Sequence, residues 1–306
     1  MNILLAGGTG FVGSALARHL QGTGHRVSLL SRRPAAPAGP IPVFHWDPER
    51  EELERAALDG VAAVVNLSGE SLAGGRWTGA RKQRLVQSRA GSTRFLVKEM
   101  REGTPPPRVL LNASAVGYYG SRGEEVLTEG SSPGTGFLAE LCRAWEEAAL
   151  SARTPGMRVV VLRFGIVLDS TGGALGMMLP IFRLGIGGPL GSGKQWMSWI
   201  AMPDLLGVIS LALDREGVEG PVNVVAPAPV RNRDFARALG RVLGRPALIP
   251  APAPALKLLL GEMAEEALLS SARVEPARLS TLGYGFRFRD LEGTLRHAVE
   301  ESHKVS

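Results

Sequence analysis

Short apolar runs alternate with longer amphipathic stretches over the first half of the chain. The first run, residues 2–6, ends at a glycine-rich segment, and the apolar positions Leu16, Ala17 and Leu20 then recur at helical spacing. A second apolar run, residues 27–30, follows. An apolar strand, an amphipathic helix and a second apolar strand predict a βαβ unit, and therefore a parallel sheet.

The same alternation continues along the chain. The further apolar runs that predict strands are 43–46, 63–67, 108–113, 158–163 and 222–225. Helical periodicity predicts helices at about 79–101, 137–152 and 232–243. We therefore predict an α/β fold with a Rossmann-type, doubly wound parallel sheet.

The second half of the chain is less regular. Glycine and proline interrupt residues 172–203, a proline-rich segment at 246–254 predicts a stiff connector, and a helical stretch at 255–272 precedes a short unit at 273–300. We expect two domains. The expected ranges are 1–166 for the coenzyme-binding domain, with a returning segment at about 198–228, and 167–197 together with 229–306 for a smaller α/β substrate domain.

Composition excludes several classes of protein. The 306 residues are 44% hydrophobic and 21% charged, which is typical of a soluble globular chain. Apolar runs stay short of the ~20 residues that span a bilayer, and residues 1–8 lack the basic start of a signal peptide, so we expect no membrane association. A single cysteine, Cys142, excludes a disulfide framework and fits the cytoplasm.

Charge and histidine spacing narrow the partners further. The net charge is +6, but the arginines are spread along the chain and form no basic stripe interleaved with aromatic residues. We therefore expect no nucleic-acid partner. The five histidines do not cluster at metal-ligand spacing, so we expect no metal site.

The glycine-rich segment is the first candidate site. Gly7, Gly10 and Gly13 follow a predicted strand and open a predicted helix, where tight turns and free helix N–H groups suit a pyrophosphate. The alternative is a simple tight turn. The residues that we expect to bind a dinucleotide here are Gly7, Thr9, Gly10, Phe11, Val12 and Gly13.

The end of the second strand bears on which coenzyme binds. An acidic residue at this position usually binds the ribose 2′-hydroxyl of NAD, but this chain has Ser31, Arg32 and Arg33. Arginine pairs with a 2′-phosphate through charge-assisted hydrogen bonds. We therefore predict NADP(H) rather than NAD(H), although the arginines could also serve only solubility.

These features resemble the extended, epimerase-like branch of the short-chain dehydrogenase/reductase superfamily. The resemblance includes the glycine segment, the loop Gly191–Gln195 with Trp199–Asp204, and the segment 221–225. It implies that the turn after the strand at 63–67 packs against the coenzyme. The further coenzyme-binding residues that it implies are Asn66, Leu67, Ser68, Gly69, Glu70, Ala113 and Arg163. Arg163 could alternatively bind a substrate anion, or pair with Glu70 or Glu140.

A narrower resemblance rests on short segments spread over the chain: Trp46–Pro48, Asn66–Glu70, Arg76-Trp77, Lys82, Ser88-Arg89, Ser114–Gly120, Phe137–Cys142, Trp145-Glu146 and Gly261–Met263. These segments are similar to a poorly characterised family of NAD(P)-dependent epimerase-like proteins, some of which carry a cell-division-inhibitor label. The resemblance implies the fold and the coenzyme but no settled reaction.

The expected proton-transfer residues depart from the superfamily pattern, which uses Ser, Tyr and Lys. Ser114 fits the serine position, but Phe137 and Leu141 occupy the positions that we assign to Tyr and Lys. Tyr118 and Tyr119 follow the strand at 108–113 and are our candidate acids, or alternatively packing residues. Cys142 is expected to be a small buried hydrophobe.

The substrate half departs from the pattern as well. In the nucleotide-sugar enzymes of this branch an arginine two residues after the loop glutamine binds the diphosphate, whereas Met197 stands two residues after Gln195. The large residues Trp196, Met197, Trp199, Met177 and Met178 suggest an apolar substrate pocket, or simply core. Residues 188–195 match a P-loop except that Gln195 replaces Ser or Thr, so we expect no ATP or GTP.

Together these observations predict an NADP(H)-binding, epimerase-like oxidoreductase that acts on an unknown small molecule with a non-standard proton donor. The alternative is a catalytically silent NADP(H)-binding redox sensor or regulator. The sequence leaves the substrate and the oligomeric state open.

Overall fold

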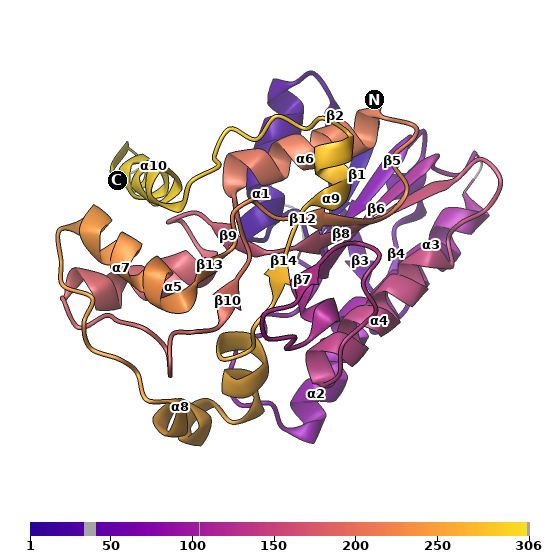
Figure 1. Cartoon of the computed structure of the whole chain (residues 1–306). Helices are drawn as coiled ribbons and strands as arrows, with labels where there is room; N and C mark the ends of the chain where they lie inside the picture. The colour runs from indigo at the N-terminus through magenta and orange to yellow at the C-terminus, as the bar shows by residue number, and fades with distance from the viewer. Residues whose placement is uncertain (34–40, 104, 305–306) are drawn as a thin grey trace.

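A twisted eight-stranded sheet organises the molecule (Figure 1). A computed structural model describes residues 1–33, 41–103 and 105–304. Its strand order is β12-β8-β6-β5-β1-β2-β3-β4, and every neighbouring pair is parallel except β3 and β4. The strands are β1 Asn2–Ala6, β2 Arg26–Ser31, β3 Val43–Asp47, β4 Glu52–Leu53, β5 Ala63–Asn66, β6 Val109–Ala115, β8 Arg158–Phe164 and β12 Gly220–Val224. The predicted α/β, Rossmann-type fold is confirmed.

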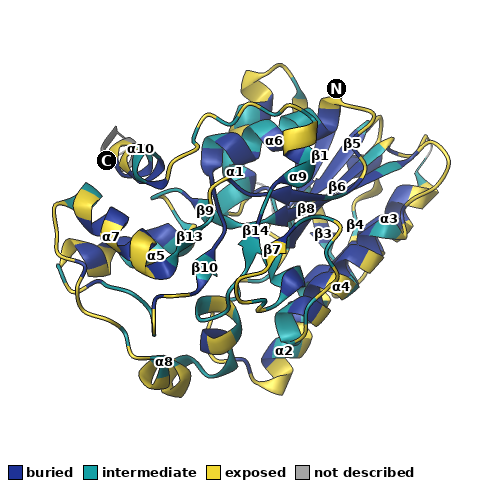
Figure 2. Cartoon of the chain, in the orientation of Figure 1, coloured by how far each residue is buried: buried dark blue, intermediate teal, exposed yellow. Residues whose placement is uncertain are grey.

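Helices cover both faces of this sheet because its central strands are apolar on both sides (Figure 2). Ile3 and Leu5 of β1 pack with α1 Phe11–Gly22 and α6 Met202–Asp214 on one face. Leu4 of the same strand packs on the other face with α3 Ser92–Glu102 and α4 Phe137–Leu150. The period of two along a strand therefore serves two separate cores.

The helix predicted at about 79–101 is interrupted. It consists of α2 Gly79–Val86, a π-helical turn η2 at Gln87–Gly91, and α3. A π-helical turn has hydrogen bonds between residues i and i+5, so it contains one residue more than a regular α-helical turn. This extra residue changes which side chains face the sheet. π-helical turns of this kind occur frequently at functional sites.

A third core lies beside the sheet. It joins the buried faces of α5 Gly173–Arg183, α7 Asn232–Leu243 and α10 Leu291–Lys304 around the fully buried Trp199. The sequence pattern predicted α7 but not α6. Proline, which stands in the first turn of α6, concealed that helix.

Short elements complete the chain. The helix expected at 255–272 is wrong as a single element, because Gly261 has a φ of +63° and ends α8 before a π-helical turn η4. The remaining elements are η1 Arg55–Leu58, η3 Val116–Tyr119, β7 Val126–Leu127, β9 Ile166–Leu168, β10 Trp196–Met197, β11 Trp199–Ala201, β13 Val230–Arg231, α8 Ala253–Leu260, η4 Ala264–Leu268, β14 Arg273–Val274 and α9 Ala277–Thr281.

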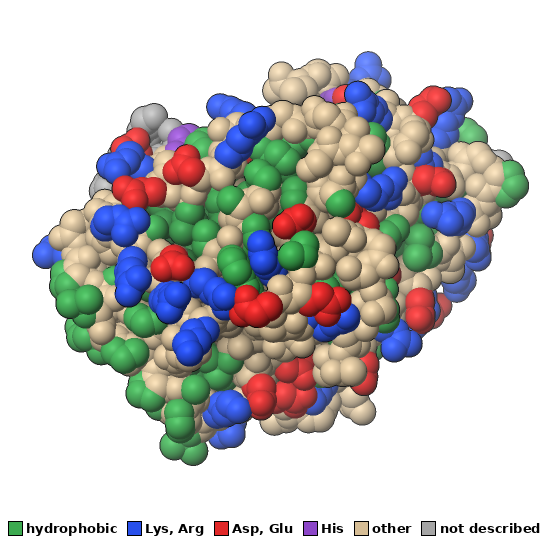
Figure 3. All heavy atoms as spheres, viewed as in Figure 1, with side chains coloured by type: hydrophobic (Ala, Val, Ile, Leu, Met, Phe, Trp, Pro, Cys, Tyr) green, Lys and Arg blue, Asp and Glu red, His purple; other side chains and the backbone are tan. Residues whose placement is uncertain are grey.

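The surface carries both signs of charge. On the face seen in Figure 3, basic and acidic side chains are interspersed rather than gathered into one stripe. Within the described ranges, none of the helices is long and apolar enough to cross a membrane. The same ranges contain no cluster of three His, Cys, Asp or Glu side chains placed to hold a metal ion.

Candidate coenzyme and active site

The glycine segment forms a tight turn that leads directly into α1. Gly7 has a φ of +78°, and the Gly10 N–H donates to the Gly7 carbonyl at 3.0 Å. A methyl group on Gly13 would lie 2.2 Å from that same carbonyl oxygen, so only glycine allows the helix to approach the turn. No side chain caps the helix at Gly10. The N-terminus of α1 therefore presents N–H groups and the positive end of the helix dipole to an anion.

The other predicted residues of this segment lie at its edge. Thr9 and Gly10 are exposed, and Phe11 and Val12 are half-buried. The ring of Phe11 lies against the start of α5, where a methyl group on Gly172 would come within 2.6 Å of it. The glycine segment is thus covered on one side by the second half of the chain.

The carboxyl end of β2 presents two arginines. Ser31 accepts a hydrogen bond from the Arg33 N–H at 3.1 Å, which turns the chain outward. Arg32 and Arg33 are exposed, and in the part of the chain that the structure describes neither forms an ion pair. Two cations thus lie at the carboxyl end of β2, which pairs with β1, the strand that leads into the glycine turn.

Asn66, at the end of β5, is fully buried and organises the turn that follows. Its amide donates to Thr93 Oγ1 at 2.9 Å and to Asn112 Oδ1 at 2.7 Å, and its oxygen accepts hydrogen bonds from Ser68. The turn then lies against the glycine segment, because a methyl group on Gly7 would be 2.7 Å from the Leu67 carbonyl. Asn66 therefore shapes the site from beneath, while Leu67, Ser68 and Gly69 form its surface.

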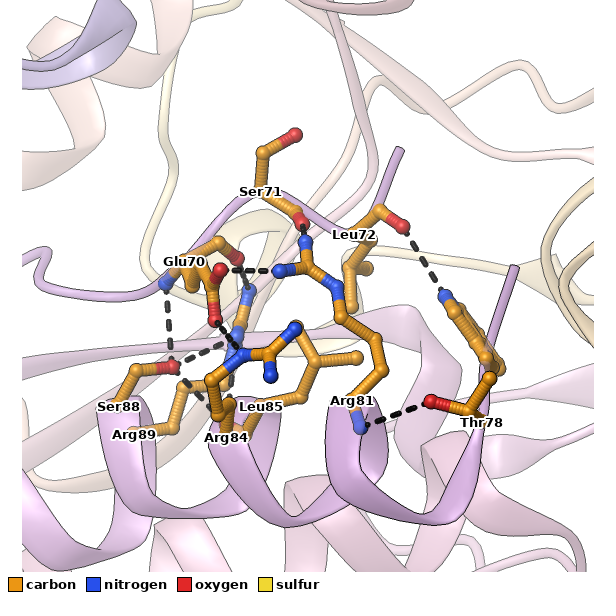
Figure 4. Close-up of polar contacts among 10 residues, drawn as sticks. Glu70, Ser71, Leu72, Thr78, Arg81, Arg84, Leu85, Ser88 and Arg89 are labelled. Carbon is orange, nitrogen blue, oxygen red and sulfur yellow. Dashed lines mark hydrogen bonds and ion pairs between the residues drawn. The ribbon is translucent and has the colours of Figure 1, made fainter. Parts of the chain in front are cut away.

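Three arginines of the α2–η2 helix hold Glu70 in place (Figure 4). Arg81 donates to the Glu70 carboxylate, and Arg84 Nε lies 3.9 Å from its other oxygen. Arg89 donates to the Glu70 main-chain carbonyl at 2.8 Å, and Ser88 accepts from the Glu70 N–H. The carboxylate of Glu70 thus faces Arg81 rather than the glycine segment.

Ser114 belongs to a buried polar network at the carboxyl end of β6. It is 2% exposed, and its hydroxyl donates to Glu146 at 2.7 Å. Arg163 donates to both carboxylate oxygens of Glu146, at 2.9 and 2.8 Å. Of the alternatives for Arg163, the pairing with Glu70 or Glu140 does not occur, because Glu146 is its partner and Arg81 pairs with Glu70. Burial acts against the charged form of Arg163, but the hydrogen bonds and charge of Glu146 give a net rise in its pKa.

Tyr119 extends the same network and is completely buried. Its hydroxyl donates to Asn223 Oδ1 at 2.7 Å and accepts from Arg163 at 2.9 Å. Burial raises the pKa of Tyr119 to about 12, against the opposing charge of Arg163. Ala113, just before Ser114, is 5% exposed.

Tyr118 differs from its neighbour. It is half-buried, its ring lies 3.5 Å from the Arg163 guanidinium carbon, and its hydroxyl has no hydrogen-bond partner among the described residues. Of the two candidate acids, Tyr118 is therefore the one whose phenol remains available.

Helix α4 faces Ser114 with a register one residue away from the one that we predicted. A methyl group on Gly117 would lie 3.4 Å from Leu138 Cβ and 3.8 Å from Cys142 Sγ, and Glu146, one turn further, binds Ser114. Phe137 and Leu141 pack in a cluster with Trp77 and Met263, and Leu138 also packs against this cluster. Leu138 and Cys142 thus occupy the face nearest the serine. Burial raises the pKa of Cys142 to about 11.

The expected apolar substrate pocket is not assembled from the residues that suggested it. Trp199 is fully buried in the third core, and Met197 is buried with it. Trp196 stacks between Arg231 and Arg273, whose guanidinium carbons lie 4.3 and 4.7 Å from its ring centre. Met177 is 58% exposed. The alternative assignment to core is correct for Trp199 and Met197.

An open groove of about 720 Å³ lies where α2, the start of α4 and residues 262–266 meet. Glu266 lines this groove and accepts hydrogen bonds from the Phe137 and Leu138 N–H groups at 2.8 and 2.7 Å. The carboxylate thereby caps α4, which has no cap of its own. Neither Glu146 nor Glu266 was predicted as a site residue. Glu146 stands four residues after Cys142 and therefore on the same face of α4, and this spacing is the signal that could have found it.

Comparison with known proteins supports the assignment of this geometry to one family. Residues 3–226 match the model of the NAD-dependent epimerase/dehydratase family, and residues 251–298 match a domain of unknown function, DUF1731. The chain belongs to the NAD-dependent epimerase/dehydratase family. It is therefore an extended short-chain dehydrogenase/reductase, as the glycine segment indicates.

Individual relatives cover nearly the whole chain. An epimerase family protein of Mycobacterium bovis is 42% identical over 97% of both chains. The crystal structure of a human epimerase family protein, SDR39U1, with NADPH has a TM-score of 0.89 at 36% identity and covers 98% of this chain and 99% of that one. A UDP-glucuronic acid 4-epimerase from Bacillus cereus, solved with NAD, has a TM-score of 0.81 at 15% identity over 100% of both chains, which shows the shared fold.

Proposed function

We propose that this protein binds NADP(H) in preference to NAD(H). The observation that carries the proposal is the pair of exposed arginines, Arg32 and Arg33, which have no ion-pair partner among the described residues and lie at the end of β2 beside the uncapped helix α1. A 2′-phosphate there would meet two cations and no carboxylate. The human relative crystallised with NADPH supports the same choice.

A titration with NADPH, NADP⁺ and NADH tests this preference. Replacing both arginines, Arg32→Ala with Arg33→Ala, should weaken NADPH binding at least about 10- to 100-fold, because even one charge-assisted hydrogen bond to the 2′-phosphate contributes about 1.5–3 kcal/mol. NADH binding should not change. Arg26→Ala is the matched control, because Arg26 is exposed at the opposite end of β2, about 20 Å away. Equal affinity of the wild-type protein for NADH and NADPH would refute the proposal.

We propose further that the protein is an oxidoreductase acting on a carbonyl group of a small molecule. When bound, NADPH would supply the hydride for the carbonyl carbon. Tyr118 supplies the proton to the carbonyl oxygen, since its phenol is half-buried and free of hydrogen bonds among the described residues. Ser114 and Tyr119 stay fixed in the network of Glu146 and Arg163, and therefore position the end of β6.

NADPH oxidation, followed by absorbance with a panel of carbonyl compounds, tests this second proposal. Tyr118→Phe should abolish turnover while leaving coenzyme affinity and the melting temperature unchanged. Tyr119→Phe should lower the melting temperature instead, because it leaves Asn223 and Arg163 without a hydroxyl. Unchanged turnover in both variants would exclude tyrosine as the acid.

One observation favours the alternative of a silent redox sensor. Leu138 and Cys142 stand on the face of α4 nearest Ser114, and neither leucine nor a buried thiol with a pKa of about 11 transfers protons readily at neutral pH. A sensor should bind one redox form at least ~100-fold more tightly than the other, about 2.7 kcal/mol. An enzyme should bind both forms comparably.

Cytoplasmic location also stays a proposal, based on the single buried thiol; one plant relative is described as chloroplastic.

A further inference from the structure

Three arginines are almost completely buried near the carboxyl edge of the sheet, and one of them lacks a counter-ion. Arg81, Arg89 and Arg163 are 8%, 9% and 3% exposed. Arg81 pairs with Glu70, and Arg163 pairs with Glu146. Arg89 forms no ion pair with any residue that the structure describes. Its hydrogen bonds go to neutral oxygens, the carbonyls of Leu85 and Glu70 and the hydroxyl of Ser88.

An unpaired buried cation is costly, because burial removes its hydration. Burial accordingly lowers the pKa of Arg89, while Cys142 and Glu70 oppose that change. The π-helical turn η2, with Arg89 at its centre, directs this side chain inward where the regular helix before it exposes Arg84. The fold therefore holds a positive charge beneath the turn after β5 without an ion-pair partner among the described residues.

The position of Arg89 indicates which ligand. A methyl group on Gly69 would lie 3.1 Å from its guanidinium carbon, so the cation lies directly beneath the turn after β5 (Figure 4). The guanidinium carbon also lies 5.3 Å from the ring centre of Trp145 on α4, three residues after Cys142. Arg89 is therefore at the carboxyl ends of β5 and β6.

Sheet order then relates Arg89 to the two halves of the coenzyme. The strand with the glycine turn, β1, lies between β2 and β5. A dinucleotide with its pyrophosphate over β1 and its 2′-phosphate at Arg32 on the β2 side must extend its nicotinamide half over β5 and β6. Arg89 lies on that second side.

We propose that Arg89 is a coenzyme-positioning residue, the cation that lies beside the nicotinamide half of bound NADP(H). The face of α4 nearest Ser114 carries no lysine, so η2 supplies the positive charge instead. This inference rests on the proposed coenzyme binding. Its consequence is electrostatic: the oxidised nicotinamide ring carries a positive charge and the reduced ring does not. A neighbouring cation therefore disfavours NADP⁺ relative to NADPH.

The ratio of the two dissociation constants, Kd for NADP⁺ over Kd for NADPH, tests the inference. Arg89→Gln removes the charge and retains hydrogen-bonding groups, and should lower this ratio about tenfold. Arg89→Lys retains the charge and should restore the wild-type ratio. Arg84→Gln is the matched control, because it removes the same charge from the exposed side of the same helix. Thermal melts of all variants identify any loss of folding.

The outcomes separate the inference from the proposed function. A purely structural role of Arg89 would weaken both redox forms equally and leave the ratio unchanged in Arg89→Gln, which would overturn the inference. Should Arg89→Gln unfold, the same ratio is measured in a second neutral variant, Arg89→Met: a ratio below that of the wild type supports the inference, and an unchanged ratio overturns it. Failure of the wild-type protein to bind either form would instead refute the proposed coenzyme.

Discussion

The buried pair of Glu146 and Arg163 allows the sharpest prediction about stability. Glu146 is 5% exposed and accepts three hydrogen bonds, two from Arg163 and one from Ser114. Glu146→Gln keeps the shape of the side chain but leaves the guanidinium as an uncompensated buried charge. Breaking a buried ion pair from one side costs about 3–5 kcal/mol. We expect the free energy of unfolding to fall by about 3 kcal/mol and the melting temperature to fall on the order of 10 °C.

Urea denaturation followed by circular dichroism measures this change. Glu147→Gln is the matched control, because Glu147 is the next residue on α4 and is exposed, and it should change stability by less than about 0.5 kcal/mol. The double variant Glu146→Leu with Arg163→Met removes both charges and should recover much of the loss. Equal effects of Glu146→Gln and Glu147→Gln would refute the reasoning that the pair is buried and coupled.

Three further predictions follow from the geometry. Glu266→Ala should destabilise the fold by about 1–2 kcal/mol by uncapping α4, whereas Glu265→Ala next to it, exposed in an ion pair with Lys257, should have little effect in the same denaturation assay. Cys142 should not react with a thiol reagent at pH 8 until denaturant is added, because burial raises its pKa to about 11; rapid native labelling would contradict this. Burial lowers the pKa of His19 below 6.5, so the unfolded chain binds the proton more readily and stability should fall as the pH drops from 7.5 to 5.5, less steeply in His19→Gln.

The pattern of apolar runs was sufficient to predict the sheet because its central strands are buried on both faces. All seven predicted strands belong to the eight-stranded sheet, and β4 alone was missed, since two residues carry no periodic signal. Helix α6 was missed because proline, which signals a loop in isolation, is tolerated in the first turn of a helix.

The sequence by itself determined the coenzyme turn, because the glycine spacing is a local property: Gly7, Gly10 and Gly13 act within one turn and one helix. The polar networks could not be determined in this way. The pairing of Arg163 with Glu146, the capping of α4 by Glu266 across 129 residues, and the lack of an ion pair between Arg89 and any described carboxylate depend on which elements meet in three dimensions. Charges on separate elements have no sequence spacing that links them, so only the tertiary structure decides which of them are neutralised and which remain for a ligand.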